Sequence, residues 1–175
     1  MCAFLRGVNI GSNKMNMAEV CDVFRREKVH KVCSMLATGN ILFESRLTKT
    51  DLHAILEKGL SEHYGMKLYL FIKDEVEIDD ILKSTPFEPN PDLQVYAFIC
   101  ESGFEMELMD RFSHITPVVD EKAQIKDGQF YWQVRKGATL DSGFSKILGD
   151  KQLKNRFTSR NINTMQKVYD RLISL

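Results

Sequence analysis

Residues 31–45 read KVCSMLATGNILFES, in which two mainly apolar stretches flank Thr38-Gly39-Asn40. Gly and Asn both tolerate a positive φ, so this tripeptide is typical of a tight turn between antiparallel strands. The pattern therefore predicts a β-hairpin with strands at 31–37 and 40–45. This hairpin decides the fold, because helical patterns lie on both sides of it.

The segments around the hairpin complete one folding unit. Residues 1–6 are an apolar stretch that predicts a strand, and residues 17–24 carry apolar side chains at helical spacing. Residues 52–60 form a second helical stripe. Residues 67–73 are apolar enough to be a strand covered on both faces. The resulting order, β-α-β-β-α-β, is the split unit of ferredoxin-like folds.

The same order of elements begins again in the second half. Three of the prolines lie in residues 85–92, which predicts a linker between an N-terminal subdomain, 1–84, and a C-terminal subdomain, 93–175. Asp127-Gly128 separates two strand patterns and is the strongest two-residue hairpin signal. The last helix is expected from about Asn161. We therefore predict an α/β (α+β) chain of two ferredoxin-like subdomains, the second being β-α-β-β-α followed by C-terminal helices.

The composition is that of an ordinary globular protein. The chain has 175 residues, of which 43% are hydrophobic and 27% charged, which excludes disordered and fibrous classes. No apolar run approaches the roughly 18–20 residues of a membrane span, and no export signal is recognisable, so we expect a cytoplasmic protein without a membrane partner. The four cysteines form no C-x-x-C pair and are expected to be reduced thiols. No spacing predicts a metal site, and the cofactor is unknown.

The formal net charge of zero is a cancellation between blocks. Lys+Arg and Asp+Glu number 11 and 7 in residues 1–73, 1 and 11 in 74–110, 5 and 4 in 111–145, and 7 and 2 in 146–175. This pattern excludes a uniformly basic surface for nucleic acid, but it leaves basic ends that could bind an anion. The alternative is that the acidic middle pairs with the basic ends.

Three segments resemble a known family. They are 4–11 (FLRGVNIG), followed by Lys14 and 17–19 (MAE), then 38–45 (TGNILFES) and 158–164 (TSRNINT). In these segments the chain resembles the bacterial family known as domain of unknown function 1697. It differs from the usual pattern at Ser12, Thr38 and Ile162, where Gly, Ser and an aromatic residue are common. The resemblance implies an α/β protein with two ferredoxin-like subdomains and brings no established activity.

The first candidate for a binding segment is residues 6–14, RGVNIGSNK. It joins a predicted strand to a predicted helix, where backbone N–H groups attract anions. Arg6 and Lys14 would supply positive charge and Asn9 an amide, although the glycine spacing is not that of a Walker loop. The alternative is a structural turn in which the glycines supply positive φ.

The second candidate is residues 158–164, where six of seven side chains carry hydrogen-bonding groups. The guanidinium of Arg160 suits a phosphate or carboxylate, and Asn161 and Asn163 add amides. The alternative is that these groups only cap and anchor the last helix. Asn40 would join the site if its hairpin turns toward residues 6–14, and is otherwise part of a plain turn.

We therefore predict that the protein binds a small anionic ligand carrying a phosphate or carboxylate. The predicted ligand-binding residues are Arg6, Asn9, Lys14, Asn40, Arg160, Asn161 and Asn163. No general base or nucleophile is identifiable, so whether the protein is an enzyme stays open, as does its oligomeric state. The alternative function is a nucleic-acid-binding or protein-interaction module that uses the sheet faces and the basic C-terminal segment. Against RNA binding, alternation places Phe130, Trp132 and Val134 on one face, which predicts a core.

Overall fold

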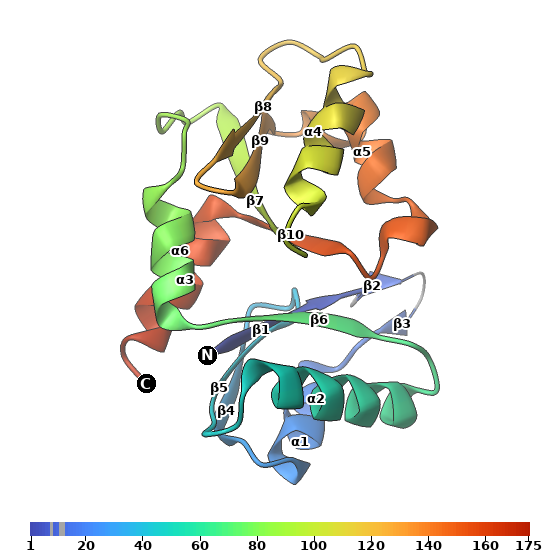
Figure 1. The fold of residues 1–175 in the computed structure, drawn as a ribbon, viewed down its shortest axis with the longest axis vertical. Coiled ribbons are helices and arrows are strands. Elements are labelled where there is room, and N and C mark those ends of the chain that lie inside the picture. The colour runs from blue at the N-terminus through green and yellow to red at the C-terminus, as the bar shows by residue number, and fades with distance from the viewer. Residues whose placement is uncertain (8, 11–12) are drawn as a thin grey trace. The chain divides into compact units, whose positions relative to one another are not determined.

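The computed structural model describes residues 1–7, 9–10 and 13–175, without the side chains of residues 9, 10, 13, 14 and 151. The chain divides into two compact units. Figure 1 labels the helices and strands that make them up. Unit 1 consists of residues 1–78 and 167–175, and unit 2 of residues 79–166. The predicted subdomain limits, 1–84 and 93–175, stay a prediction.

Unit 1 contains a four-stranded antiparallel sheet with two helices on one face (Figure 1). Its elements are β1 (Cys2–Arg6), α1 (Met17–Arg26), β4 (His30–Met35), β5 (Asn40–Glu44), α2 (Lys49–Tyr64) and β6 (Tyr69–Lys73). The strand order is β4-β5-β1-β6. The short strands β2 (Asn9–Ile10) and β3 (Asn13–Lys14) pair with each other between β1 and α1. After β6 comes α3 (Glu75–Lys83).

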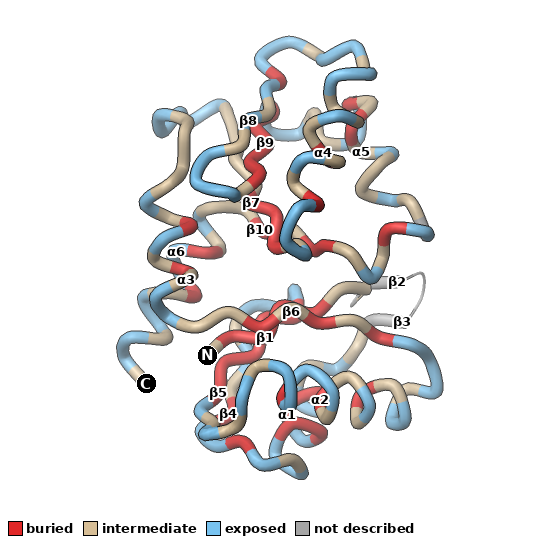
Figure 2. The backbone as a smooth tube through the Cα atoms, viewed as in Figure 1, coloured by how far each residue is buried: buried red, intermediate tan, exposed pale blue. Residues whose placement is uncertain are grey.

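The core of unit 1 is mainly aliphatic. Leu52, Leu56 and Leu60 of α2 are fully buried against Ala3, Leu5 and Ile41 of the sheet, and Figure 2 shows the buried residues along β1 and β5. The start of α2 is fixed by Thr48, whose hydroxyl accepts a hydrogen bond from the backbone N–H of Asp51. The apolar spacing at 52–60 therefore predicted the helix and its buried face correctly.

Unit 2 repeats this topology. Its elements are β7 (Leu93–Cys100), α4 (Phe104–Ser113), β8 (Lys122–Lys126), β9 (Gln129–Arg135), α5 (Gly143–Leu148) and β10 (Phe157–Asn161). The strand order in its sheet is β10-β7-β9-β8. If the four sheet strands of each unit are numbered in chain order, this is 4-1-3-2. The sheet of unit 1, read from β6 to β4, has the same order. Short 3₁₀ turns at Ala138–Leu140 and Lys151–Leu153 flank α5, and α6 (Ile162–Leu172) follows β10. The prediction of two ferredoxin-like subdomains is confirmed.

The core of unit 2 is aromatic. Phe130, Trp132 and Val134 of β9 are fully buried, as their alternation predicted. The ring of Phe144 on α5 lies 5.4 Å from that of Trp132 and 5.6 Å from that of Phe130, measured between centroids. These aromatic side chains fill the core and are not an exposed platform for bases.

The two predicted hairpin turns differ in outcome. Asp127 and Gly128 have φ of 51° and 73°, which confirms the two-residue turn between β8 and β9. The first hairpin has a four-residue loop, because Met35 pairs with Asn40. The prediction of a strand through residue 37 and a tight turn was therefore wrong. The buried amide of Asn40 donates to the Met35 carbonyl (3.0 Å) and to Thr38 Oγ1 (2.9 Å), and these bonds close the longer loop.

Strand β10 is absent from the sequence prediction. Residues 158–164 were expected to lead directly into the last helix, but Phe157–Asn161 pair with β7 in antiparallel register and α6 begins at Ile162. The segment is polar, and polar residues are poor strand signals although the backbone ladder does not require apolar side chains. With β10, the second unit is a complete β-α-β-β-α-β.

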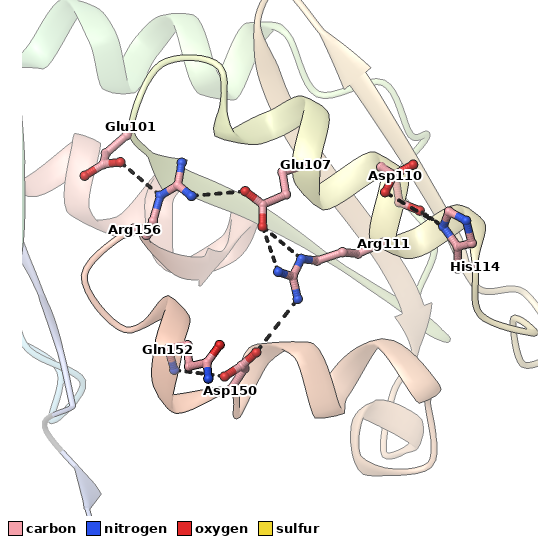
Figure 3. A network of polar contacts seen from close by, with 8 residues as sticks. All are labelled: Glu101, Glu107, Asp110, Arg111, His114, Asp150, Gln152 and Arg156. Atoms are coloured by element: carbon pink, nitrogen blue, oxygen red, sulfur yellow. Dashed lines mark hydrogen bonds and ion pairs between the residues drawn. The ribbon is translucent and has the colours of Figure 1, made fainter.

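The acidic middle of the sequence pairs with the basic ends inside each unit, as the alternative predicted. In unit 1, Lys49 Nζ lies 2.6 Å from Asp74 Oδ2. In unit 2, Arg156 bridges Glu101 (3.1 Å) and Glu107 (3.0 Å), and a network that includes Arg111 extends from there (Figure 3). Part of the acidic charge of the middle segment is therefore paired with basic side chains of the two ends within each unit.

Among the described helices, none is long and apolar enough to cross a membrane. The four cysteines form no disulfide, and Cys2 and Cys21 are buried whereas Cys33 and Cys100 are partly exposed.

Candidate functional site

The predicted residues of unit 1 that the structure describes are Arg6 and Asn40. Arg6 ends β1, and Asn40 begins β5 opposite Phe4. Because side chains alternate along a strand, Phe4, Arg6 and Asn40 share one face of the sheet. Burial lowers the pKa of Arg6, although a guanidinium stays charged at neutral pH. The side chains of Asn9 and Lys14 lie outside the described residues.

Of the predicted residues of unit 2, Arg160 and Asn161 lie on opposite faces of β10, and Asn163 lies in the first turn of α6. Arg160 is buried, and its Nη1 donates to Thr158 Oγ1 and to the Ser159 carbonyl, both at 2.8 Å. Asn161 belongs to the opposite face by alternation. Its Oδ1 accepts a hydrogen bond from the backbone N–H of Asn163 (2.9 Å), so it caps α6. The capping role proposed for this segment is therefore confirmed for Asn161.

Asn161 and Asn163 line a cavity of about 610 Å³ in unit 2. The cavity lies where β7 begins and where β9 and β10 end, since both of these strands are antiparallel to β7. The proline-rich residues 87–91 form one wall and residues 93–95 of β7 another. Leu82, Thr85, Lys136, the start of α6 and Gln166 complete the lining. Its volume is within the range of small-molecule sites.

One positive and one negative side chain line this cavity, Lys136 and Glu88. Lys136 directly follows β9, and its backbone N–H donates to the Asp92 carbonyl at 3.0 Å. This bond holds the base of the Lys136 side chain beside the start of β7. Within the part of the chain that the structure describes, neither the Lys136 ammonium nor the Glu88 carboxylate has an ion-pair partner.

Carboxamide side chains supply most of the remaining polar lining. They are Asn90, Gln94, Asn161, Asn163 and Gln166. Asn90 Oδ1 accepts from the Asp92 N–H (2.8 Å) and Asn161 Oδ1 is the cap of α6, so both keep an NH₂ group as donor. Gln94 Nε2 donates to Thr139 Oγ1 (2.7 Å), which leaves its carbonyl oxygen as an acceptor. The lining therefore offers donors, acceptors and both charges.

A second cavity, of about 490 Å³, shares Asn90, Leu93 and Lys136 with the first. Its other charged residues include Arg135 and Asp120, whose side chains form an ion pair at 2.7 Å. Lys136 thus borders both cavities.

Sequence reasoning missed Lys136 and Glu88. Glu88 lies in the segment predicted as a linker, which in the structure belongs to unit 2 and lines the cavity. The signal that could have found Lys136 is its place just after the second strand of the Asp127-Gly128 hairpin. The pairing of Leu93 with Arg135 is needed to bring it to the cavity, and composition does not fix that register.

Among the described residues, no group of three or more His, Cys, Asp or Glu could hold a metal ion. The arrangement can hold a small charged molecule through an ammonium, a carboxylate and several amides.

Comparison with known proteins supports the fold and the family. The chain is similar in structure to the conserved bacterial protein SP0830 from Streptococcus pneumoniae, with a TM-score of 0.76 and 22% identity over 98% of this chain and 97% of that chain. No curated protein matches the chain. Residues 1–131 match the family described as Protein of unknown function (DUF1697), and this range includes two of the three segments that carried the resemblance. The chain therefore belongs to the DUF1697 family.

Proposed function

We propose that the protein binds a small ligand carrying a carboxylate or phosphate group in the unit 2 cavity. The observation that carries the proposal is that Lys136 and the capped start of α6 line the same cavity. An ammonium gives a charge-assisted hydrogen bond to an anionic oxygen, and the first turn of a helix favours negative charge. The amide nitrogen of Asn161 adds a further donor.

Arg160 would support the site from the neighbouring position of β10. Its bond to Thr158 Oγ1 lies within the strand that ends at Asn161, so it would help hold the cap of α6 in place. The prediction that Arg6, Asn9, Lys14 and Asn40 also contact the ligand stays a prediction.

Isothermal titration calorimetry of the full chain with inorganic phosphate and with citrate tests this proposal. We expect saturable binding of at least one anion, weakened about tenfold or more by Lys136→Met, because a charged hydrogen bond contributes roughly 1.5–3 kcal/mol. The matched control is Lys122→Met, since Lys122 is also exposed in unit 2 but lies outside the cavity. Equal loss of anion affinity in both variants would overturn the proposal.

The same instrument addresses the alternative from the sequence. A nucleic-acid-binding module would bind an oligonucleotide with an affinity that falls steeply as the salt concentration rises. A small-anion site would bind phosphate or citrate without needing an oligonucleotide.

A further inference from the structure

We infer that the ligand of the unit 2 cavity is a short peptide with both termini free. This inference rests on the proposed function and names its ligand class. It follows from three properties of the lining: its two opposite charges, its mixture of donors and acceptors, and its apolar walls.

The charges favour a zwitterion. A ligand with only anionic groups would pair with Lys136 but would add negative charge to a lining that contains Glu88, an exposed carboxylate with no ion-pair partner among the described residues. A charge brought next to a like charge as water is displaced is unfavourable unless it is paired. A peptide places a carboxylate at one end and an ammonium at the other. We assign the carboxylate to Lys136 and the ammonium to Glu88.

The carboxamides favour peptide groups between those ends. Each peptide unit has one N–H donor and one carbonyl acceptor. The NH₂ groups of Asn90 and Asn161 can donate to peptide carbonyls, and the Gln94 carbonyl oxygen can accept from a peptide N–H. A dianionic phosphate ester has only acceptor oxygens and would form no hydrogen bond with the Gln94 oxygen.

The apolar part of the lining favours small apolar side chains. Phe87, Pro89 and Pro91 come from the proline-rich wall, and Val95 and Ile162 from the sheet and α6. At about 610 Å³ the cavity admits a ligand of a few residues and not a folded partner.

A mononucleotide is the competing ligand. Asn and Gln side chains can pair with the edge of adenine, and Phe87 could stack on its ring. Its phosphate would pair with Lys136, but a mononucleotide has no ammonium to pair with Glu88, so the observations favour the peptide.

Calorimetric titration of the full chain with the tripeptide Ala-Leu-Ala, its N-acetyl form and its C-terminal amide tests the inference. We expect the free peptide to bind, and each blocked form to bind about tenfold or more weakly, because each loses one charged contact. Glu88→Gln should weaken binding of the free peptide while leaving the N-acetyl form unchanged. Lys136→Met should weaken the free peptide while leaving the amide unchanged. Glu105→Gln on α4 and Lys122→Met are the matched controls, because both residues lie outside the cavity.

The outcomes separate the inference from the proposed function. Binding of phosphate or citrate without binding of Ala-Leu-Ala would keep the proposed function and overturn the peptide inference. Equal binding of the N-acetyl and free forms, or tighter binding of adenosine monophosphate than of the peptide, would also overturn it. Failure of every probe would overturn both.

Discussion

The helix that connects the third and fourth strands of the sheet is long in unit 1 and short in unit 2. In unit 1, α2 has 16 residues and buries three leucines, whereas in unit 2 α5 has 6 residues and buries Phe144. The strand order is nevertheless the same in both units. The comparison shows that this topology does not depend on helix length. In each unit the helix must instead cover one face of the sheet with apolar side chains. Helix α2 does this with several aliphatic side chains along its length, and α5 does it with one central aromatic ring.

The difference extends to buried polar groups. Among the described residues of unit 1, Asn40 is the buried polar side chain, and its NH₂ group donates to Met35 and Thr38 of its own hairpin. In unit 2, the buried Glu121 joins separate elements. Its carboxylate accepts from Trp132 Nε1 and the Val118 N–H, both at 2.8 Å, and from the hydroxyl of Ser142 at the start of α5. A short helix is thus held by an aromatic cluster and by a buried hydrogen-bonded carboxylate.

The largest effect is expected from Phe144→Ala. This ring lies within 5.9 Å, between centroids, of Phe98, Phe112, Phe130 and Trp132. Its removal should leave a cavity at the centre of unit 2 and cost about 3–5 kcal/mol of unfolding free energy. Urea denaturation followed by the fluorescence of Trp132, the one tryptophan of the chain, measures this in unit 2.

The matched variant in unit 1 is Leu52→Ala, a fully buried residue at one end of the leucine stripe. We expect it to cost less than Phe144→Ala, because Leu56 and Leu60 remain to cover the sheet. Circular dichroism measures the unfolding free energy of Leu52→Ala. If Leu52→Ala loses more unfolding free energy than Phe144→Ala, unit 2 does not depend on the single ring of α5 more than unit 1 depends on one leucine of α2.

A somewhat smaller effect is expected from Glu121→Ala, about 2–3 kcal/mol, since it leaves the indole N–H of Trp132 and the Ser142 hydroxyl buried without an acceptor. Trp132→Phe loses core contacts in either background, but it should cost less in the Glu121→Ala background, because there it also removes one of these orphaned donors. Chemical denaturation of the single and double variants checks this. If Glu121→Ala unfolds at the wild-type urea concentration, the carboxylate does not hold α5.

The smallest effect is expected from Lys49→Met, which removes the ammonium that joins α2 to the start of α3 in unit 1. Burial is the largest single influence and would raise the pKa of Asp74 and of Glu77, but the hydrogen bonds from Lys49, backbone hydrogen bonds and the nearby lysine charges together outweigh it and lower both. Lowered carboxylate pKa values add stability above the unfolded values of 3.8 and 4.5, and this stability is lost as the pH falls through the folded values. Because these side chains are 35–41% exposed, the pairs contribute at most about 1 kcal/mol.

Thermal unfolding measured from neutral pH down to about pH 3 tests this dependence. The stability of Lys49→Met should fall less steeply with acid than that of the wild type. Lys58→Met is the control, because Lys58 lies on the same helix, is 76% exposed and pairs only loosely with Glu62 at 3.9 Å. Parallel curves for Lys49→Met and the wild type would contradict the role of this network.

The sequence predicted those parts of the fold that local patterns encode. Asp127-Gly128 has the backbone preference of a two-residue turn, and the apolar spacing of α2 has the period of a helix. Strand β10 could not be predicted in this way, because Thr158, Ser159 and Arg160 are placed in the sheet by pairing with β7. That pairing is a tertiary contact and leaves no period in the segment itself.

The candidate site was predictable to the same extent. Asn161 and Asn163 were singled out by the run of hydrogen-bonding side chains at 158–164, and both line the cavity. Lys136 and Glu88 were not found, since they reach the cavity through the register of β7 on β9 and through the path of the proline-rich segment. The strand register and the path of the segment are tertiary features, and the neighbouring residues in the sequence do not determine them.

The most direct test of the central claim, that the unit 2 cavity holds a small ligand with an anionic group, is a nuclear magnetic resonance titration of isotope-labelled protein. The ligand is whichever of phosphate, citrate and Ala-Leu-Ala binds most tightly. We expect saturable shifts of the side-chain amide signals of Asn90 and Asn161 and of the backbone amides of Lys136 and Asn163. The side-chain amide of Asn155, which is exposed in unit 2 outside the cavity, should not shift. If the signals of these cavity residues do not shift at a saturating ligand concentration, the account is contradicted.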